Sequence, residues 1–163
     1  MQPKITLKNI KYSAFMSEET ICFEATVYKD NKRWCVAKND GHGGCTAFNP
    51  IQGMSGSVMW KEVSAFNQNA KSHESTCGSS TLNIKEDLEW VVSTLINDWL
   101  ELKELKKVLK KPTAYNPEDN SIVQWNTSFK PNMVEEINKK WPHYVVMNEL
   151  PQDEALLLFR KAS

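Results

Sequence analysis

The fold is decided by residues 21–38, which read ICFEATVYKDNKRWCVAK. Apolar and polar side chains alternate from Ile21 to Val27, which is the period of a strand with one buried face. The polar residues Asp30-Asn31-Lys32 favour a tight turn, after which the chain returns with Trp34 and Val36 on a common face. Two such strands joined by a short polar turn predict an antiparallel hairpin.

A further strand is predicted before this hairpin. Apolar and polar side chains also alternate in residues 5–12, but the apolar side chains change from one face of the strand to the other between Leu7 and Ile10. This change predicts a β-bulge or a strong twist. The polar residues Ser17-Glu18-Glu19 predict the turn that joins this strand to the hairpin. The N-terminal quarter of the chain therefore predicts an antiparallel β-meander.

The longest predicted element is a helix over Ile84–Leu109. We expect Asn83 to cap it, with Glu86 completing a variant capping box, and Pro112 to end it. Apolar residues recur in it at helical spacing, so one face is expected to pack against the meander. The predicted core joins both elements: Ile21, Phe23, Val27, Trp34, Val36, Leu88, Val92, Leu95 and Trp99.

The remaining segments predict short elements separated by loops. Loops are expected where Gly, Ser, Thr, Asn and Pro gather, at 46–56, 71–82 and 112–120. Short elements are expected as a helix at 58–70, a strand at 121–128, a helix from Pro131, a strand at 144–147 and a helix from Pro151. The chain, 1–163, predicts a single α+β domain: an N-terminal antiparallel β-meander packed against one long helix, followed by a C-terminal β-α-β-α segment.

Composition excludes several classes of protein. The chain has 163 residues, of which 40% are hydrophobic and 25% charged, and these values exclude disordered and collagen-like chains. No apolar run is long enough to span a membrane, and the first residues lack the apolar core of a signal peptide, so we expect a cytoplasmic protein. Basic and acidic residues balance at 20 each, which makes nucleic acid an unlikely partner.

A glycine-rich segment follows the predicted hairpin: Asn39, Asp40, Gly41, His42, Gly43 and Gly44. Its spacing matches neither a P-loop nor a dinucleotide fingerprint. Consecutive backbone N–H groups of such a loop can form a nest for an anion, with His42 as a further donor, which predicts a small anionic ligand such as a nucleotide. The alternative is a tight exit from the strand that needs glycine only for its backbone.

The same segment supports a second hypothesis, a zinc site. His42 and Cys45 form one close pair and His73 and Cys77 another, and zinc takes tetrahedral sets of such ligands. The alternative places Cys45 in the core and the other pair in a loop. Cys45, His42 and Asp40 also supply the residue types of nucleophilic catalysis, but neighbours in sequence rarely form a triad, so no catalytic residue is assigned.

The six tryptophans are the last feature that points to function. Tryptophan is enriched among the residues that anchor protein interfaces. Trp90 lies off the main apolar stripe of the predicted long helix, so it is the candidate for a partner surface. We expect no membrane partner and no resident cofactor other than a zinc ion.

Segments at both ends of the chain resemble a group of small proteins encoded by bacteriophages and prophages. They are KNIK (8–11), SEET (17–20), CFEATVY (22–28), NDGHGG (39–44), NELP (148–151), DEAL (153–156) and FR (159–160). The resemblance implies a phage setting, in which small accessory proteins act by binding. It implies no catalytic residue.

These observations predict a non-enzymatic phage accessory protein that binds a host or defence protein and inhibits or redirects it. The first alternative is a domain that binds a small anionic molecule through the glycine-rich loop, 39–45. The further alternative is a small zinc-binding protein or enzyme.

Overall fold

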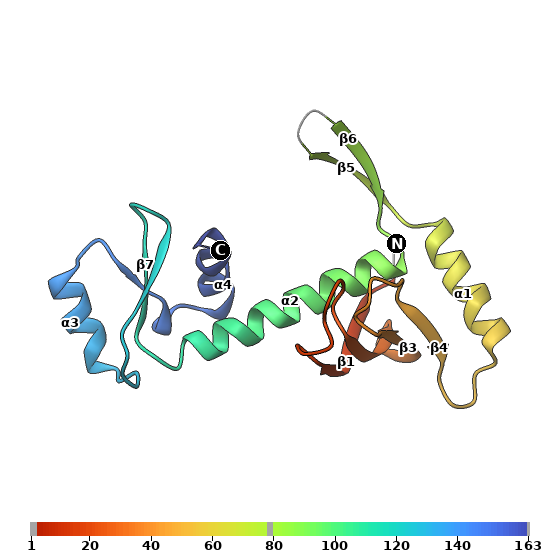
Figure 1. Cartoon of the computed structure of the whole chain (residues 1–163), viewed down its shortest axis with the longest axis horizontal. Helices are drawn as coiled ribbons and strands as arrows, with labels where there is room; N and C mark the ends of the chain where they lie inside the picture. Colours follow the sequence, from red (N-terminus) through yellow and green to blue (C-terminus); the bar gives the residue numbers. More distant parts are fainter. Residues whose placement is uncertain (1–2, 78–79, 163) are drawn as a thin grey trace. The chain divides into compact units, whose positions relative to one another are not determined.

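The computed structural model describes residues 3–77 and 80–162 and confirms the α+β fold class (Figure 1). Contacts group into two compact units, Met1–Ile96 and Asn97–Ser163, and helix α2 (Leu88–Val108) begins in the first and ends in the second. The prediction of a single domain, 1–163, stays a prediction. No helix among the described residues is long and apolar enough to cross a membrane.

Unit 1 is built on a four-stranded antiparallel sheet in the order β1-β2-β3-β4. Its strands are β1 (Ile5–Tyr12), β2 (Phe23–Lys29), β3 (Lys32–Asn39) and β4 (Ala47–Pro50). The hairpin β2–β3 turns at Asp30 and Asn31, which both have positive φ as such tight turns require. The predicted irregularity in β1 is also present, as a register shift between Lys8 and Lys11.

A second register shift changes which residues of β3 face the core. Val27 pairs with Cys35 and Tyr28 with Arg33, so Trp34 is the extra residue of a bulge. Trp34 and Cys35 are therefore both buried, whereas Val36 is half-buried. The prediction that Trp34 and Val36 share the buried face was wrong at Val36, because the bulge shifts which residues of β3 point to the core.

The helices of unit 1 follow the predicted apolar spacing. Helix α1 (Gly56–Gln68) buries Met59, Val63 and Phe66, and the side chain of Ser55 caps it. Of the predicted core, Phe23, Val27, Trp34, Leu88 and Val92 are buried. Ile21, Leu95 and Trp99 are only half-buried.

Three predicted loops contain strands instead. Segment 46–56 contains β4, segment 71–82 contains β5 (Ser72–Cys77) and the start of β6 (Ser80–Lys85), and segment 112–120 contains the buried β7 (Thr113–Asn116). The pairing of β5 with β6 uses residues 80–85, so helix α2 begins at Leu88 rather than at Ile84. The amide of Trp90 is capped by the side chain of Asp87, not of Asn83.

Unit 2 contains the C-terminal elements. They are β7, β8 (Ser121–Gln124), α3 (Asn132–Lys140), β9 (Val145–Val146), the 3-10 turn η1 (Met147–Glu149) and α4 (Gln152–Ala162). The strands form a small antiparallel sheet in the order β8-β7-β9. Its core is a cluster of Leu105, Tyr115, Met147 and Ala155.

Candidate functional site

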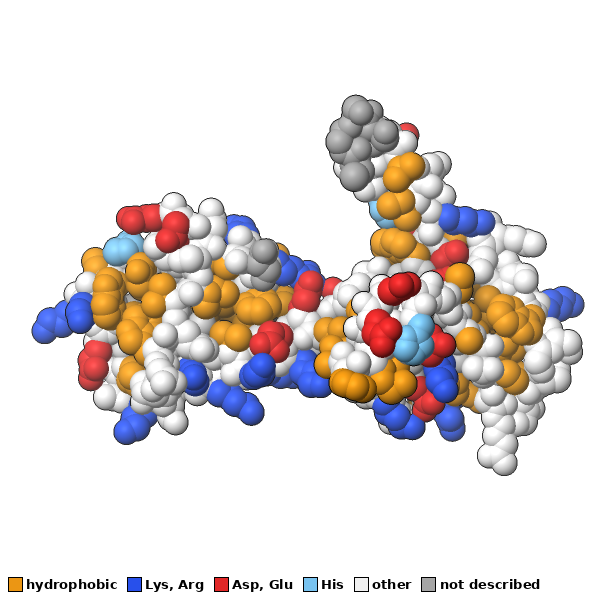
Figure 2. Space-filling view, in the orientation of Figure 1, with side chains coloured by type: hydrophobic (Ala, Val, Ile, Leu, Met, Phe, Trp, Pro, Cys, Tyr) orange, Lys and Arg blue, Asp and Glu red, His pale blue; other side chains and the backbone are white. Residues whose placement is uncertain are grey.

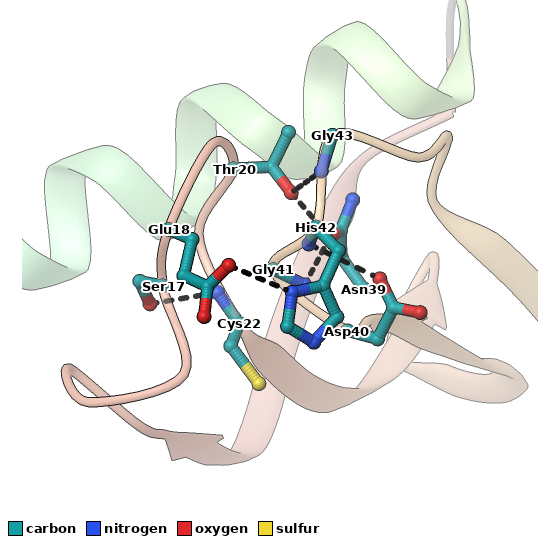
Figure 3. Close-up of polar contacts among 9 residues, drawn as sticks. All are labelled: Ser17, Glu18, Thr20, Cys22, Asn39, Asp40, Gly41, His42 and Gly43. Carbon is teal, nitrogen blue, oxygen red and sulfur yellow. Dashed lines mark hydrogen bonds and ion pairs between the residues drawn. The ribbon is translucent and has the colours of Figure 1, made fainter.

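The glycine-rich loop is organised by the side chain of Asn39, which is buried at the end of β3 (Figure 3). Its Oδ1 atom accepts hydrogen bonds from the Thr20 hydroxyl at 2.7 Å and the Gly41 amide at 2.9 Å. Its Nδ2 atom donates to the carbonyl of Gly44 at 2.8 Å. One amide side chain therefore closes the loop on itself and joins it to the segment before β2.

The carbonyl oxygen of Gly41 makes the second connection between these segments. It accepts the backbone N–H groups of Glu18, Glu19 and Thr20 at 3.1, 3.0 and 3.2 Å. Gly41 has a φ of +91°, and a Cβ atom there would lie 1.9 Å from the carbonyl oxygen of Met16. Glycine is thus required at this position by both the backbone angle and the close approach.

The segment 13–22 is also fixed by its own hydrogen bonds. The Ser17 hydroxyl donates to the carbonyl of Ser13 at 2.7 Å and accepts the Cys22 amide at 2.8 Å. The Ser13 amide donates to the carbonyl of Cys22 at 3.1 Å. We call the segments 13–22 and 39–45 the paired loops, because these contacts hold them as one structure.

The paired loops expose two large apolar side chains, Phe15 and Met16, which we call the apolar tip. Phe15 is 95% exposed and Met16 is 46% exposed. Glu18, Glu19 and Asp40 are exposed on the same paired loops. Figure 2 shows acidic side chains grouped on this face of unit 1, with apolar side chains beside the group. Lys11 and Lys38 line a cavity together with Met16, so charged groups of both signs lie near the apolar tip.

The structure brings all six predicted ligand residues, Asn39 to Gly44, together, but three of their N–H groups already have acceptors within the chain. The amides of Gly41, His42 and Gly43 donate to Asn39, Asp40 and Thr20, respectively. The nest of converging amides lies instead at residues 18–20, and the Gly41 carbonyl fills it. Three consecutive amides that the anion-binding hypothesis would use, those of Gly41, His42 and Gly43, are therefore engaged within the chain.

The charge around the loop does not favour an anion either. The Nδ1 atom of His42 lies 3.3 Å from a carboxylate oxygen of Glu18, beside the exposed Asp40. A cavity of about 200 Å³ behind the loop has Glu89 in its wall, whose carboxylate accepts the Thr46 amide at 2.6 Å. Negative groups thus line both sides of the loop.

The four residues of the zinc hypothesis have different surroundings. His42 contacts Glu18, whereas His73 on β5 contacts Glu86, with Nδ1 3.1 Å from its carboxylate. Cys45 is exposed rather than buried, and the side chain of Cys77 lies outside the described residues. Among the described residues, no group of three or more His, Cys, Asp and Glu side chains could hold a metal ion.

Trp90, the predicted partner residue, is half-buried, and its ring packs edge-on against His73 with centroids 5.4 Å apart. The more exposed tryptophan is Trp60 on α1, at 51%. Sequence reasoning missed the apolar tip. A signal was available, because Phe15-Met16 lies between two strands in an otherwise polar turn.

Comparisons with protein-family models, with curated proteins and with solved structures found no match to this chain. The site is therefore defined by its geometry: two loops fixed to each other that carry an exposed apolar tip and several exposed acidic side chains.

Proposed function

We propose that this chain is a non-enzymatic protein-binding protein that contacts its partner through the apolar tip of the paired loops. The observation that carries the proposal is the 95% exposure of Phe15 on a loop whose backbone is held by hydrogen bonds at both ends. Aromatic residues and methionine are enriched in protein interfaces, and Phe15 and Met16 supply one of each.

The energetics of such an anchor are favourable. Burying one phenylalanine side chain contributes roughly 1.5–3 kcal/mol, which corresponds to about ten- to a hundredfold in affinity. Association also costs free energy when a loop must become ordered. The hydrogen bonds of Ser17 and Gly41 already fix the backbone beside Phe15, so this cost is small.

The charge of the surface indicates the chemistry of the partner. Glu18, Glu19 and Asp40 are exposed on the paired loops, whereas Lys11 and Lys38 line a cavity together with Met16, so the complementary surface is an apolar pocket whose rim carries charges of both signs. The resemblance of the chain to phage-encoded proteins supports a host or defence protein as the partner. Binding would block or redirect that protein without any chemical step by this chain.

The test compares two truncations of exposed apolar side chains. Phe15→Ala removes the anchor, and Leu157→Ala on α4, where leucine is 59% exposed, is the matched control. A protein captured from host lysate by the wild type is identified, purified and titrated with each variant by calorimetry. We expect a one-to-one complex that Phe15→Ala weakens by about tenfold or more, that Leu157→Ala leaves unchanged, and that weakens with salt.

A stability control makes this result decisive. Phe15→Ala should unfold at the wild-type denaturant concentration, because the side chain is almost wholly exposed. Equal affinity of the Phe15→Ala variant and the wild type for the purified partner would refute the proposal.

A further inference from the structure

The four-stranded sheet of unit 1 has two different faces. The side chains of Phe23, Ala25 and Val27 on β2 are buried in the core, so the residues between them point to the opposite side. Strand pairing places further residues on that side: Thr6, Lys8 and Lys11 of β1, Glu24, Thr26 and Tyr28 of β2, Arg33, Val36 and Lys38 of β3, and Ala47 and Asn49 of β4. We call this set the outer face. All of its residues except Thr26 are exposed or half-buried.

The outer face is basic, although the whole chain balances at 20 basic and 20 acidic residues. Among the residues that the structure describes on these strands, one side chain of the outer face is acidic, that of Glu24. The basic ones are Lys8, Lys11, Arg33 and Lys38. Glu24 is already paired, because the Nζ atom of Lys11 lies 2.8 Å from its carboxylate. The balance of the whole chain therefore does not describe this surface, which has a positive excess.

The basic side chains are spread over the outer face. One row across the sheet holds Lys11 and Lys38, and Arg33 lies in another row, opposite Tyr28. The two rows are four residue steps apart on β2, which is about 13 Å. Lys8 lies between them, with its Nζ atom 4.7 Å from the centroid of the Tyr28 ring. This spacing suits contacts with several phosphates of one chain better than contact with a single anion.

Two register shifts place the basic residues on this face. In a regular strand, residues three or five apart point to opposite faces. The shift between Lys8 and Lys11 brings both to the outer face, where they pair with residues of β2. In β3, the extra residue Trp34 has the same effect on Arg33 and Lys38. Without these irregularities, each pair of basic residues would be divided between the core and the surface.

We propose that the outer face binds single-stranded nucleic acid. Proteins bind such strands with basic side chains that contact the phosphates and aromatic side chains on which the bases stack. The open face of a four-stranded sheet supports this kind of binding in known modules. Here the basic side chains supply the phosphate contacts, and the half-buried ring of Tyr28 lies among them. An acidic protein segment would match the charge but would not need the ring.

The direct test is a titration with a fluorescein-labelled oligothymidylate, followed by fluorescence anisotropy. A length of about twelve nucleotides lies within the usual site sizes of about 4–16 nucleotides. For single strands, the slope of log affinity against log salt is about −0.7 for each phosphate contact. Three to four contacts predict a slope of about −2 to −3, so the affinity should fall about 15- to 65-fold between about 50 and 200 mM salt.

A double variant tests the charges of the outer face. Lys8→Gln with Lys38→Gln should weaken oligothymidylate binding by about tenfold or more at about 50 mM salt and make the salt slope shallower by about 1.4. The matched control, Lys61→Gln with Lys139→Gln, removes the same charge from exposed lysines of α1 and α3. It should bind like the wild type, which separates the position of the charge from its amount.

A second variant tests the ring. Tyr28→Leu should weaken oligothymidylate binding by about tenfold at every salt concentration and leave the salt slope unchanged, because stacking on a ring releases no counterions. Its control, Trp60→Leu on α1, removes a ring that is 51% exposed away from the outer face and should bind like the wild type. If Tyr28→Leu does not fold, the lysine variants still decide the question.

Three results would overturn the inference. The first is the absence of saturable oligothymidylate binding at about 50 mM salt, where charge contacts are strong. The second is equal affinity of the wild type and the double variant of Lys8 and Lys38. The third is equally tight binding of a polyglutamate of the same charge, which would assign the outer face to an acidic protein segment.

Discussion

Replacing Gly41 by alanine should detach the paired loops from each other. The residue has a φ of +91°, and the added methyl group would lie 1.9 Å from the carbonyl oxygen of Met16. That oxygen belongs to the backbone, so the clash cannot be relieved by rotating a side chain. The segment 13–22 must move, and the Gly41 carbonyl then loses the amides of Glu18, Glu19 and Thr20.

The magnitude follows from these two effects. A left-handed backbone angle costs a non-glycine residue about 1–2 kcal/mol. Three backbone hydrogen bonds contribute about 0.5–1.5 kcal/mol each to the free energy of unfolding. Partial relaxation lowers the sum, and we expect Gly41→Ala to destabilise unit 1 by about 3–5 kcal/mol. That is a large part of the roughly 5–15 kcal/mol by which most domains are stable.

Gly44→Ala is the matched control, because a Cβ atom at Gly44 would meet no atom within 4 Å. Urea unfolding followed by tryptophan fluorescence should place the Gly41→Ala midpoint about 2 M below that of Gly44→Ala. Hydrogen exchange should show faster exchange of the amides of residues 18–20 in the Gly41→Ala variant alone. Free energies of unfolding that agree within about 0.5 kcal/mol would refute the reasoning, because the contact with Met16 would then carry no cost.

Two further predictions concern titratable groups. Burial raises the pKa of the Cys35 thiol to about 12, so iodoacetamide at pH 8 should alkylate the exposed Cys45 and spare Cys35 until urea unfolds the chain; equal rates in the folded protein, measured by mass spectrometry, would contradict this. The hydrogen bond from Lys11 lowers the pKa of Glu24, so this pair contributes stability at neutral pH that is lost as the pH falls through the lowered pKa. Lys11→Met should raise the pKa of Glu24 toward its ordinary value in a carboxylate titration by nuclear magnetic resonance, and an unchanged pKa would exclude Lys11 as the cause.

Much of unit 1 could be predicted from local pattern. The hairpin β2–β3 follows from apolar alternation in β2 and the polar turn after it, and α1 from the spacing of Met59, Val63 and Phe66. The hairpin β5–β6 could not be predicted in this way, because its strands are rich in serine and threonine. Its pairing depends on register, in which Leu82 and Ile84 lie opposite Ser75 and His73, and composition does not reveal register.

The site shows the same division between local and tertiary information. The sequence identified the glycine-rich loop and its need for glycine, and Gly41 confirms that need. It did not reveal that residues 18–20 donate to the Gly41 carbonyl, because that contact joins segments more than twenty residues apart. The burial of Trp34 beside Cys35 was equally hidden, since it accompanies a bulge that only strand pairing defines.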